Sequence, residues 1–356
     1  MRPGRHHLES LDAFRGLTIA GMILVNNPGT WDAVYAPLVH SDWNGWTLAD
    51  LVYPFFMVIL GVALPFALSR RQQSGQDVLR LHVRIVRRTV LLFALGFALS
   101  LVAAQFAWPV VRIPGVLQRI ALVYFVAALI TLHANRGRGV IACGLLVLHW
   151  VILSSGSLTQ GHTLELAIDR AMFGRHLLLP TGDPEGLLGT LSAVVSALIG
   201  TYAGDWLRNA PEDRHVTRRL FGAGAVLTVA GWAFSFIIPI NKPLWTPSYA
   251  VFTGGLAFIA LAACYYTIDV ADVRGWARPF VWLGINPLAI YFLAELVGHI
   301  LELTTLKTTL YWGLLHQLTR SRMSEHATSL LFAVITVAVW TAVAGLMYRR
   351  GVRIQV

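Results

Sequence analysis

The sequence predicts an all-α integral membrane protein, a polytopic bundle of about ten transmembrane helices with both termini in the cytoplasm. Only 13% of its 356 residues are charged and 56% are hydrophobic, whereas a soluble domain carries about 25% charged residues. Apolar runs of about 20 residues, long enough to cross a bilayer as a helix, recur along nearly the whole chain. Because no stretch is polar enough to form a soluble domain, residues 1–356 are predicted to form a single transmembrane domain.

Ten apolar runs of near-bilayer length are bounded by charged or turn residues. In chain order, the predicted spans are Ser10–Asn27, Thr47–Ser69, Val83–Phe106, Gly115–His133, Gly139–Ser155, Gly186–Leu207, Arg219–Pro239, Ser248–Val270, Pro279–Leu301 and Ala327–Tyr348. No small-residue cleavage site follows the first run, so we expect it to be retained rather than removed as a signal peptide. The longest outer loop, residues 156–185, is expected to hold a short interfacial helix.

The positions of the basic residues set the predicted orientation. Arg2 and Arg5 precede the first span, and further arginines follow spans two, four, six and eight. The alternate loops are much poorer, and the one between spans seven and eight has only Lys242. The positive-inside rule therefore puts both termini in the cytoplasm, as an even number of spans requires. These loops account for the net charge of +10, so no nucleic-acid partner is expected.

Polar side chains collect in the segments that this topology places outside the cytoplasm. Asn26 ends the first span, His40 and Asp42 lie in the following loop, and Asp50 lies about one turn inside the second span. The others are Asn27, Trp43, Asn44, Arg112, Gln118, Arg119, Asp183, Glu185, Asn241, Lys242 and Trp245. Because these distant segments share one depth, they predict a pocket open to the non-cytoplasmic face.

Several of these residues also have a purely structural interpretation. Trp43, Trp46 and Trp245 are typical of the aromatic belt at a membrane interface. Asp50 and Arg119 are costly in hydrocarbon unless they are paired or hydrated, and a salt bridge between them would satisfy both.

Two further groups of polar residues lie away from the outer loops. Asn286 and Pro287 predict a helix break that frees a carbonyl for binding or for packing. Glu295 is half a helical turn out of phase with Asn286, so a shared wall is doubtful. Three arginines on one cytoplasmic helix face suit an anionic cofactor or positive-inside signalling. They are Arg84, Arg87 and Arg88. The histidines form no HxH or HxxxH pair, so no metal is expected.

Five blocks, taken in this order, resemble the catalytic domain of the heparan-alpha-glucosaminide N-acetyltransferase family and its bacterial relatives. The blocks are "SLDAFRGLTIAGMILVN", "HSDWNGWTLADLVYPFF", "RIPGVLQRIALVYF", "DPEGLLGTLSAVVSALIGTYAG" and "PINKPLWTPSY". They extend from residue 10 to about residue 255, and "NPLAIY" in the ninth span adds a weaker match. The order of the blocks is highly specific for the family and less specific for the substrate.

The resemblance implies a transmembrane acetyltransferase that uses cytosolic acetyl-CoA and acetylates an amino sugar or glycan on the opposite side of the membrane. It implies that His40 is the catalytic histidine, that Asn26 lies beside the active site, and that the protein is a homodimer. For a bacterial relative, it implies a multi-pass protein of the inner (plasma) membrane. The loop "NPGTWDAVYAPLV" and a first span near residue 10 depart from the lysosomal enzyme, so that enzyme's glycan substrate is not carried over.

The chemistry of these residues suits acetyl transfer. Histidine has an unperturbed pKa of about 6.5, so His40 is expected to act as the base that deprotonates the amine or as a nucleophile that takes the acetyl group. Asn26 would donate to the oxyanion, and Asp50 is preferred over Asp42 as the residue that orients His40. The expected substrate- and cofactor-binding residues are Gln118, Arg119, Lys242, Trp245 and Asn286, with Arg84, Arg87 and Arg88 at the nucleotide end of CoA.

Two other functions are compatible with the sequence. O-acylation of a cell-envelope polysaccharide or a lipid-linked sugar would use the same base, and only the acceptor would differ. A small-solute transporter is compatible with ten spans and a broken helix, but no pair of matching interrupted helices is visible in two halves of the chain.

Overall fold

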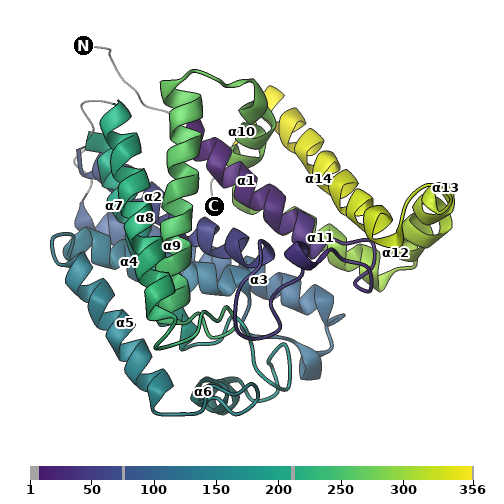
Figure 1. The fold of residues 1–356 in the computed structure, drawn as a ribbon, viewed down its shortest axis with the longest axis horizontal. Helices are drawn as coiled ribbons and strands as arrows, with labels where there is room; N and C mark the ends of the chain where they lie inside the picture. The colour runs from purple at the N-terminus through teal and green to yellow at the C-terminus, as the bar shows by residue number, and fades with distance from the viewer. Residues whose placement is uncertain (1–7, 74–76, 210–212, 355–356) are drawn as a thin grey trace. The chain divides into compact units, whose positions relative to one another are not determined.

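The computed structural model describes residues 8–73, 77–209 and 213–354, and helices form nearly all of its regular structure (Figure 1). Within these ranges no strand is present beyond two isolated β-bridges, so the predicted all-α class is confirmed. Arg2 and Arg5, which entered the orientation argument, lie outside the described residues.

Each predicted span contains a helix, although the helices of the third and seventh spans end before the predicted bounds and the ninth span is broken. The corresponding helices are α1 (Glu9–Asn26), α2 (Ala49–Gln73), α3 (Val78–Ala103), α4 (Val116–His133), α5 (Arg138–Ser154), α7 (Gly189–Asn209), α8 (Asp213–Phe234), α9 (Pro247–Tyr265) continued by the π-helical turn Tyr266–Val270, α10 (Arg278–Ile285) with α11 (Pro287–Leu303), and α14 (Glu325–Arg349). The expected helix of the longest outer loop is α6 (Leu164–Phe173). Between α11 and α14 lie the short elements α12 (Leu306–Thr308), a π-helical stretch Thr309–Leu315 and α13 (His316–Thr319).

Helix length and apolarity identify the segments able to cross a membrane. Five segments meet both conditions, and the bent pair α10–α11 would make a sixth. The five are Ala49–Ser69, Val78–Ala103, Val116–His133, Pro247–Val270 and Glu325–Arg349. The chain is therefore an integral membrane protein, while ten spans and cytoplasmic termini stay predictions. The four predicted spans outside this set are α1, α5, α7 and α8. α5 is short, and charged or polar residues lower the mean hydropathy of the other three.

The described helices group into two compact units. Unit 1 comprises Met1–His40, Thr47–Tyr53 and Cys264–Val356, and unit 2 comprises Ser41–Trp46 and Pro54–Ala263. The backbone passes from one unit to the other within α2. The prediction of a single transmembrane domain stays a prediction.

Unit 1 is built on close approach between α1 and α10, and α14 packs against both (Figure 1). A Cβ atom at Gly16 would collide with the Phe280 carbonyl, and one at Gly284 with the Asp12 carbonyl. Arg15 closes the same contact by donating from Nη1 to the Gly284 oxygen at 3.1 Å. Small residues at a helix interface allow this approach, which is how helices associate in membranes where hydrophobic burial gives little driving force.

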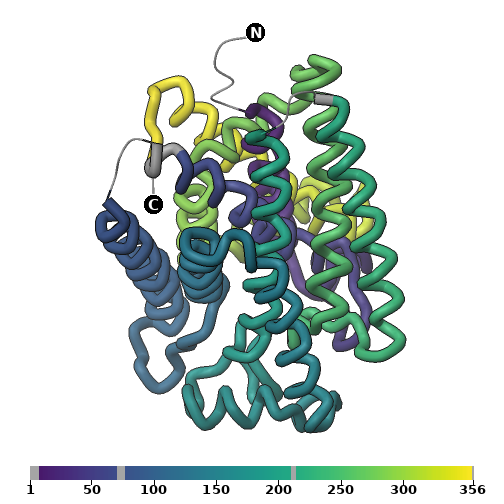
Figure 2. The backbone as a smooth tube through the Cα atoms, turned by 90° about the vertical axis from the view of Figure 1, so that its left-hand side faces the viewer, coloured from purple at the N-terminus to yellow at the C-terminus, as the bar shows by residue number. Residues whose placement is uncertain are grey.

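Unit 2 uses the same device at two helix pairs. Between α2 and α7, a Cβ atom at Gly61 would meet the Ala197 carbonyl, and one at Gly200 would meet the Val58 carbonyl. Between α8 and α9, which run side by side in Figure 2, Gly255 faces the backbone of α8. These pairs hold the loops at the helix ends in register, and those loops build the sites described next.

Candidate functional site

His40 and Asp50 are in direct contact within unit 1. Asp50 lies in the first turn of α2, and its side chain is completely buried. The backbone N–H of Thr47 donates to Asp50 Oδ2 at 3.0 Å, and the Thr47 hydroxyl donates to the same oxygen at 3.2 Å. A carboxylate is favourable at this helix N-terminus. The other oxygen, Oδ1, lies 2.8 Å from Nδ1 of His40.

This contact determines which nitrogen of the His40 ring is basic. A neutral imidazole whose Nδ1–H donates to a carboxylate carries its lone pair on Nε2. Asp50 is buried, whereas the His40 side chain is 47% exposed. The solvent-accessible His40 ring is therefore hydrogen-bonded to a carboxylate that is fixed in position. This is the arrangement in which a carboxylate orients a general base. The structure pairs His40 with Asp50, the aspartate that the sequence analysis preferred.

A second pair in unit 1 joins Asn26 and Glu295. Nδ2 of Asn26, the last residue of α1, donates to Oε1 of Glu295 in α11 at 2.8 Å. Sequence reasoning found no partner for Glu295, because contacts between helices far apart in the chain cannot be read from spacing. The pair satisfies an ionisable group that would otherwise be costly within an apolar helix and orients the Asn26 amide.

Asn286 marks the predicted helix break, and the structure confirms that break. The axes of α10 and α11 differ by 77° at this residue. Both ends of the Asn286 amide bind the C-terminal segment: Nδ2 donates to the Val352 carbonyl at 3.0 Å, and Oδ1 accepts from the Ile354 N–H at 2.7 Å. These contacts have a structural role, and substrate binding by Asn286 stays a prediction. Asn286 and Glu295 have different partners, as their helical phase predicted.

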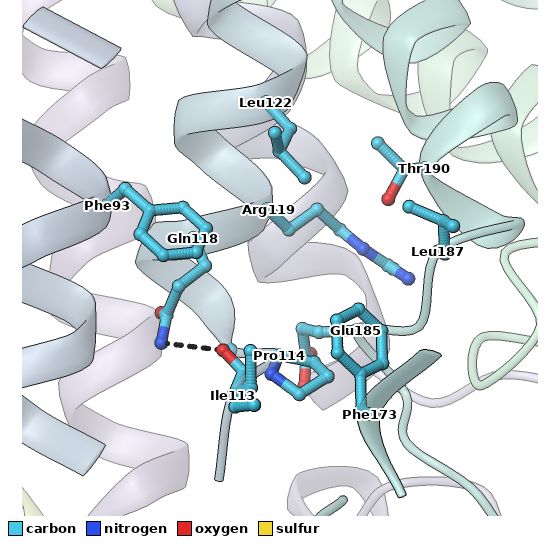
Figure 3. Close-up of a pocket in the computed structure, with 11 residues that line it drawn as sticks. Phe93, Ile113, Pro114, Gln118, Arg119, Leu122, Phe173, Glu185, Leu187 and Thr190 are labelled. Carbon is cyan, nitrogen blue, oxygen red and sulfur yellow. Dashed lines mark hydrogen bonds between the residues drawn. The ribbon is translucent and has the colours of Figure 1, made fainter. Parts of the chain in front are cut away.

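In unit 2, Arg119 and Gln118 line a cavity of about 320 Å³ with Phe93, Phe173 and Leu187 (Figure 3). Gln118 donates to the Ile113 carbonyl at 3.1 Å. Arg119 is 1% exposed and donates from Nη2 to the Gly186 carbonyl at 2.7 Å. Its Nε and Nη1 atoms have no hydrogen-bond partner among the described residues.

The ring of Trp245 supports the Arg119 guanidinium, whose carbon lies 5.2 Å from the ring centroid. Trp245 is fully buried, and its indole N–H donates to Ser196 at 3.2 Å. An interfacial anchor would lie at the membrane–water boundary, so Trp245 is instead a core residue beneath Arg119. Lys242 lies half-buried in the loop before α9 and accepts the Trp245 N–H at its carbonyl.

The three arginines of α3 differ in their surroundings. Arg84 and Arg87 are exposed, whereas Arg88 is half-buried with its guanidinium 4.5 Å from the centroid of Tyr124. A role at the nucleotide end of CoA stays a prediction for all three. Within the described ranges, no three His, Cys, Asp or Glu side chains gather as metal ligands.

Loops that the sequence analysis placed at one depth meet in a second cavity of unit 2. It measures about 530 Å³, counting the space open to solvent. Its walls come from Asp42 and Trp43, from Gln160, from Thr163, Glu165, Leu166 and Asp169 around α6, from residues 179 and 181–184, and from Pro243 and Leu244. The first loop is tied to these walls by Trp43, whose indole N–H donates to the Leu158 carbonyl at 2.9 Å, and by Asn241, which donates to Asn44 at 3.2 Å. We call this cavity the acidic pocket.

Arg112 anchors one wall of the acidic pocket. Its guanidinium contacts both Asp183 and Glu185. Burial opposes ionisation of Asp183, but the hydrogen bond and charge of Arg112 outweigh it and hold the Asp183 pKa below its usual range. The sequence analysis had placed these three residues on the same side, and the structure brings them together.

Glu165 and Asp169, on α6, are the residues that sequence reasoning missed. Glu165 Oε1 accepts the Gly189 N–H at 2.8 Å, and Asp169 Oδ1 accepts the Leu187 N–H at 2.9 Å. Burial raises the pKa of Glu165 to about 8, and burial also raises the pKa of Asp169. The available signal was two carboxylates four residues apart in a mainly apolar helix that also contains Arg170, since like charges on one helix face are unfavourable.

Comparison with known proteins shows which family the chain resembles. Residues 7–182 match the family model described as heparan-alpha-glucosaminide N-acetyltransferase, catalytic. The mouse heparan-alpha-glucosaminide N-acetyltransferase is 29% identical in an alignment that covers 98% of this chain and 60% of the mouse protein. The human protein of the same name is 28% identical, with coverages of 97% and 59%. The chain thus spans about 60% of the length of these curated relatives.

The part matched by the family model contains the His40–Asp50 pair, Asn26, Arg119 and the carboxylates of α6. The five sequence blocks that suggested the family therefore have support from two independent comparisons. The chain is therefore similar to heparan-alpha-glucosaminide N-acetyltransferases, over residues 7–182 by the family model and over nearly its whole length by the mouse and human proteins.

Proposed function

We propose that the protein is a membrane-embedded acetyltransferase that moves an acetyl group from acetyl-CoA to the amine of an amino sugar or glycan. The observation that carries the proposal is the 2.8 Å contact between His40 Nδ1 and the buried Asp50. The mouse and human relatives are named as N-acetyltransferases of heparan-alpha-glucosaminide, which supports an amine acceptor. The acceptor is placed on the extracytoplasmic side and the CoA nucleotide on the cytoplasmic side.

In the direct route, His40 acts as a general base. Nε2 takes a proton from the attacking amine as the C–N bond to the acetyl carbon forms. The C–S bond of the thioester then breaks, and the imidazolium returns the proton to the departing thiolate. The products are the acetamide and CoA, and Asp50 stabilises the positive ring that exists between these two proton transfers.

In the two-step route, Nε2 of His40 attacks the thioester and carries the acetyl group until the amine arrives. The Asp50 contact serves this route equally, because it keeps Nδ1 protonated and the lone pair on Nε2. The two routes differ in whether CoA can be released before the acceptor binds.

Both routes form a tetrahedral intermediate whose oxyanion needs a donor. Asn26 has a second amide N–H besides the one that it donates to Glu295. We assign oxyanion stabilisation to that second N–H, with Glu295 as the residue that orients the amide.

The remaining assignments complete the proposal. The protein is placed in a bacterial inner membrane as a homodimer with ten spans and cytoplasmic termini. Arg119, Gln118 and Lys242 are assigned to anionic or polar groups of the substrates, with Trp245 beneath Arg119. Asn286 is kept as a substrate contact, and Arg84, Arg87 and Arg88 as contacts to the CoA nucleotide.

The test is acetyl-CoA turnover by the purified protein with and without glucosamine, for the wild type, His40→Ala and Asp50→Asn. Glucosamine-dependent CoA release that is lost in His40→Ala supports the proposal. A burst of CoA release without glucosamine selects the two-step route. Turnover with hydroxyl acceptors alone would replace N-acetylation by O-acylation, and uptake of a solute without chemical change would replace both by transport.

A further inference from the structure

The acidic pocket of unit 2 has a one-sided charge. Asp42, Glu165, Asp169 and Asp183 line it, and none of the described lining residues is a lysine or arginine. Asp183 is neutralised by Arg112 behind the wall. The other three carboxylates have no such ion pair among the contacts of the pocket wall. The pocket is open to solvent, and its carboxylates favour a ligand that brings hydrogen-bond donors and positive charge.

Two buried oxygens in this pocket have no partner. Glu165 and Asp169 are 3% and 1% exposed. Each uses one carboxylate oxygen to cap the chain before α7, at Gly189 and Leu187. The other oxygens, Glu165 Oε2 and Asp169 Oδ2, have no hydrogen-bond partner among the described residues. A buried acceptor without a donor is unfavourable, so a ligand that supplies donors would relieve a cost already present in the fold.

The charged neighbours of Glu165 show why a cation would be held there. Burial raises the Glu165 pKa to about 8, and the charges of Asp169 and Asp183 act in the same direction. The charge of Arg119, from α4, and the hydrogen bond from the Gly189 N–H oppose this rise but do not cancel it. Arg119 donates its hydrogen bond to the Gly186 carbonyl. An ammonium group at Oε2 would supply both the missing donor and the opposite charge, and would thereby favour the ionised carboxylate.

The other walls suit a sugar rather than a metal ion or a simple amine. Gln160, Thr163 and Thr181 add neutral polar groups, and Trp43 contributes a half-exposed indole held by its bond to the Leu158 carbonyl. An aromatic face pairs with the apolar face of a pyranose ring, and carboxylates and amides bind its hydroxyls. The described residues provide no set of metal ligands at this place.

We propose that the acidic pocket is the acceptor site, in which Glu165 and Asp169 bind the protonated amine of a hexosamine while Trp43 packs against its ring. The inference rests on the proposed acetyltransferase function and deepens it, because it makes the amine rather than the hydroxyl the recognised group. Asp42 and Trp43, in the pocket wall, follow His40 by two and three residues in the chain.

The test compares glucosamine with glucose, which has a hydroxyl in place of the amine. Calorimetry on the detergent-solubilised full chain gives the two affinities for the wild type, Glu165→Gln and Asp169→Asn. Both variants keep an oxygen that can accept the backbone N–H and replace the ionisable carboxyl group by a neutral amide. We expect the wild type to prefer glucosamine by at least about tenfold, the value of one charge-assisted hydrogen bond, and each variant to lose most of that preference.

The ratio of the two affinities separates ligand recognition from a structural role, because a loosened α6 would lower the affinities for glucosamine and glucose equally. Asp272→Asn, which removes an exposed carboxylate paired with Arg274 in unit 1, is the matched control and should keep the wild-type ratio. If the α6 variants fail to fold, Asp42→Asn tests the same preference from the loop.

The outcomes of the activity and binding experiments distinguish a failure of the proposed reaction from a failure of the proposed acceptor site. If the wild type acetylates glucosamine but the variants keep the wild-type preference, the acceptor site is elsewhere and the inference is overturned. If the wild type acetylates nothing while binding depends on the two carboxylates as expected, the pocket stands as a hexosamine site and the proposed reaction falls. Absence of any preference for glucosamine in the wild type overturns the inference outright.

Discussion

Nδ1 of His40 lies 2.8 Å from Oδ1 of Asp50, and Thr47 donates two hydrogen bonds to the other oxygen of the same carboxylate. The aspartate is fixed by the first turn of α2, while the histidine belongs to the preceding loop. A helix start therefore determines the tautomer of a side chain ten residues earlier in the sequence. This dependence leads to the first prediction.

Asp50→Asn should lower kcat by about 10²-fold or more, because an amide can present a donor to Nδ1 and put the proton on the wrong ring nitrogen. The KM for acetyl-CoA should change little. Steady-state kinetics with glucosamine measures both constants, and Thr47→Ser, which keeps a hydroxyl and the backbone N–H, is the control. Equal losses in the two variants would mean that the loop geometry, and not the carboxylate, is what matters.

Asn26→Ala should lower kcat by about 10²-fold to 10³-fold, the usual effect of removing one oxyanion donor. Glu295→Gln keeps an oxygen that can accept from Asn26 and should cost far less, whereas Glu295→Ala should approach the loss seen for Asn26→Ala. The measurement is single-turnover acetyl transfer. A large loss in Glu295→Gln would show that the charge of Glu295 acts in its own right.

Gly16→Ala should destabilise the protein by about 1–3 kcal/mol, the usual cost of overpacking a close contact. The added Cβ would collide with the Phe280 carbonyl, and backbone cannot turn aside as a flexible side chain can. Gly144→Ala on α5 is the matched control, because nothing lies within 4 Å of the added atom. Thermal unfolding in detergent should separate the two variants, and equal midpoints would contradict the packing described for α1 and α10.

The raised pKa of Glu165 predicts a pH dependence of stability. In the unfolded chain a glutamate pKa is near its ordinary value of 4.5, whereas burial raises it to about 8 in the folded protein. Between these values the folded state binds more protons, so this group's contribution to stability falls as pH rises. The raised pKa of Asp169 acts in the same direction, and the lowered pKa of Asp183 acts in the opposite direction.

Glu165→Gln should remove the loss of stability that Glu165 causes as pH rises. The variant should therefore gain stability relative to the wild type between pH 5 and about pH 8. Unfolding midpoints measured across that range for both proteins check the sign. Asp272→Asn should follow the wild type throughout. A Glu165→Gln curve parallel to the wild type would show that Glu165 is already ionised at pH 5.

Asn286→Ala should release the C-terminal segment, because both hydrogen bonds to Val352 and Ile354 are lost. We expect faster digestion of the C-terminus by carboxypeptidase, with the KM for both substrates unchanged. Asn286→Asp, which keeps the acceptor for Ile354, should show an intermediate rate. A raised KM in either variant would restore the predicted substrate contact.

The structure also shows how far the sequence could be followed. Each predicted apolar run is a helix, since bilayer-length apolarity is a local property that neighbours in sequence determine. The break at Asn286 was equally local, because Pro287 lacks the N–H that a continuous helix would use. Span number was less certain, because α5 is short and α1 carries charges near its start.

Contacts between side chains that are distant in the sequence could not be predicted in this way. His40 lies in the loop that leads into α2 and Asp50 lies in the first turn of that helix, so their contact could be predicted from the sequence. The partner of Asn26, in contrast, lies 269 residues away in α11. Trp245 makes a second contact that the sequence does not reveal. Its residue type suggested a membrane interface, whereas its packing shows that it is a core residue beneath Arg119. The carboxylates of α6 were overlooked because their meaning depends on which loops cover them.

The sequence by itself therefore determined the helices, the membrane class and the resemblance to the acetyltransferase family, because periodicity, hydropathy and short motifs lie within one segment. The tertiary structure alone decided that Glu295 holds Asn26, that Asn286 holds the C-terminal segment, and that segments distant in the sequence enclose the acidic pocket. Those facts depend on how helices approach one another through glycine contacts such as Gly16 with Phe280. Such packing brings together residues that are distant in the sequence, and these contacts cannot be read from the order of residues in the chain.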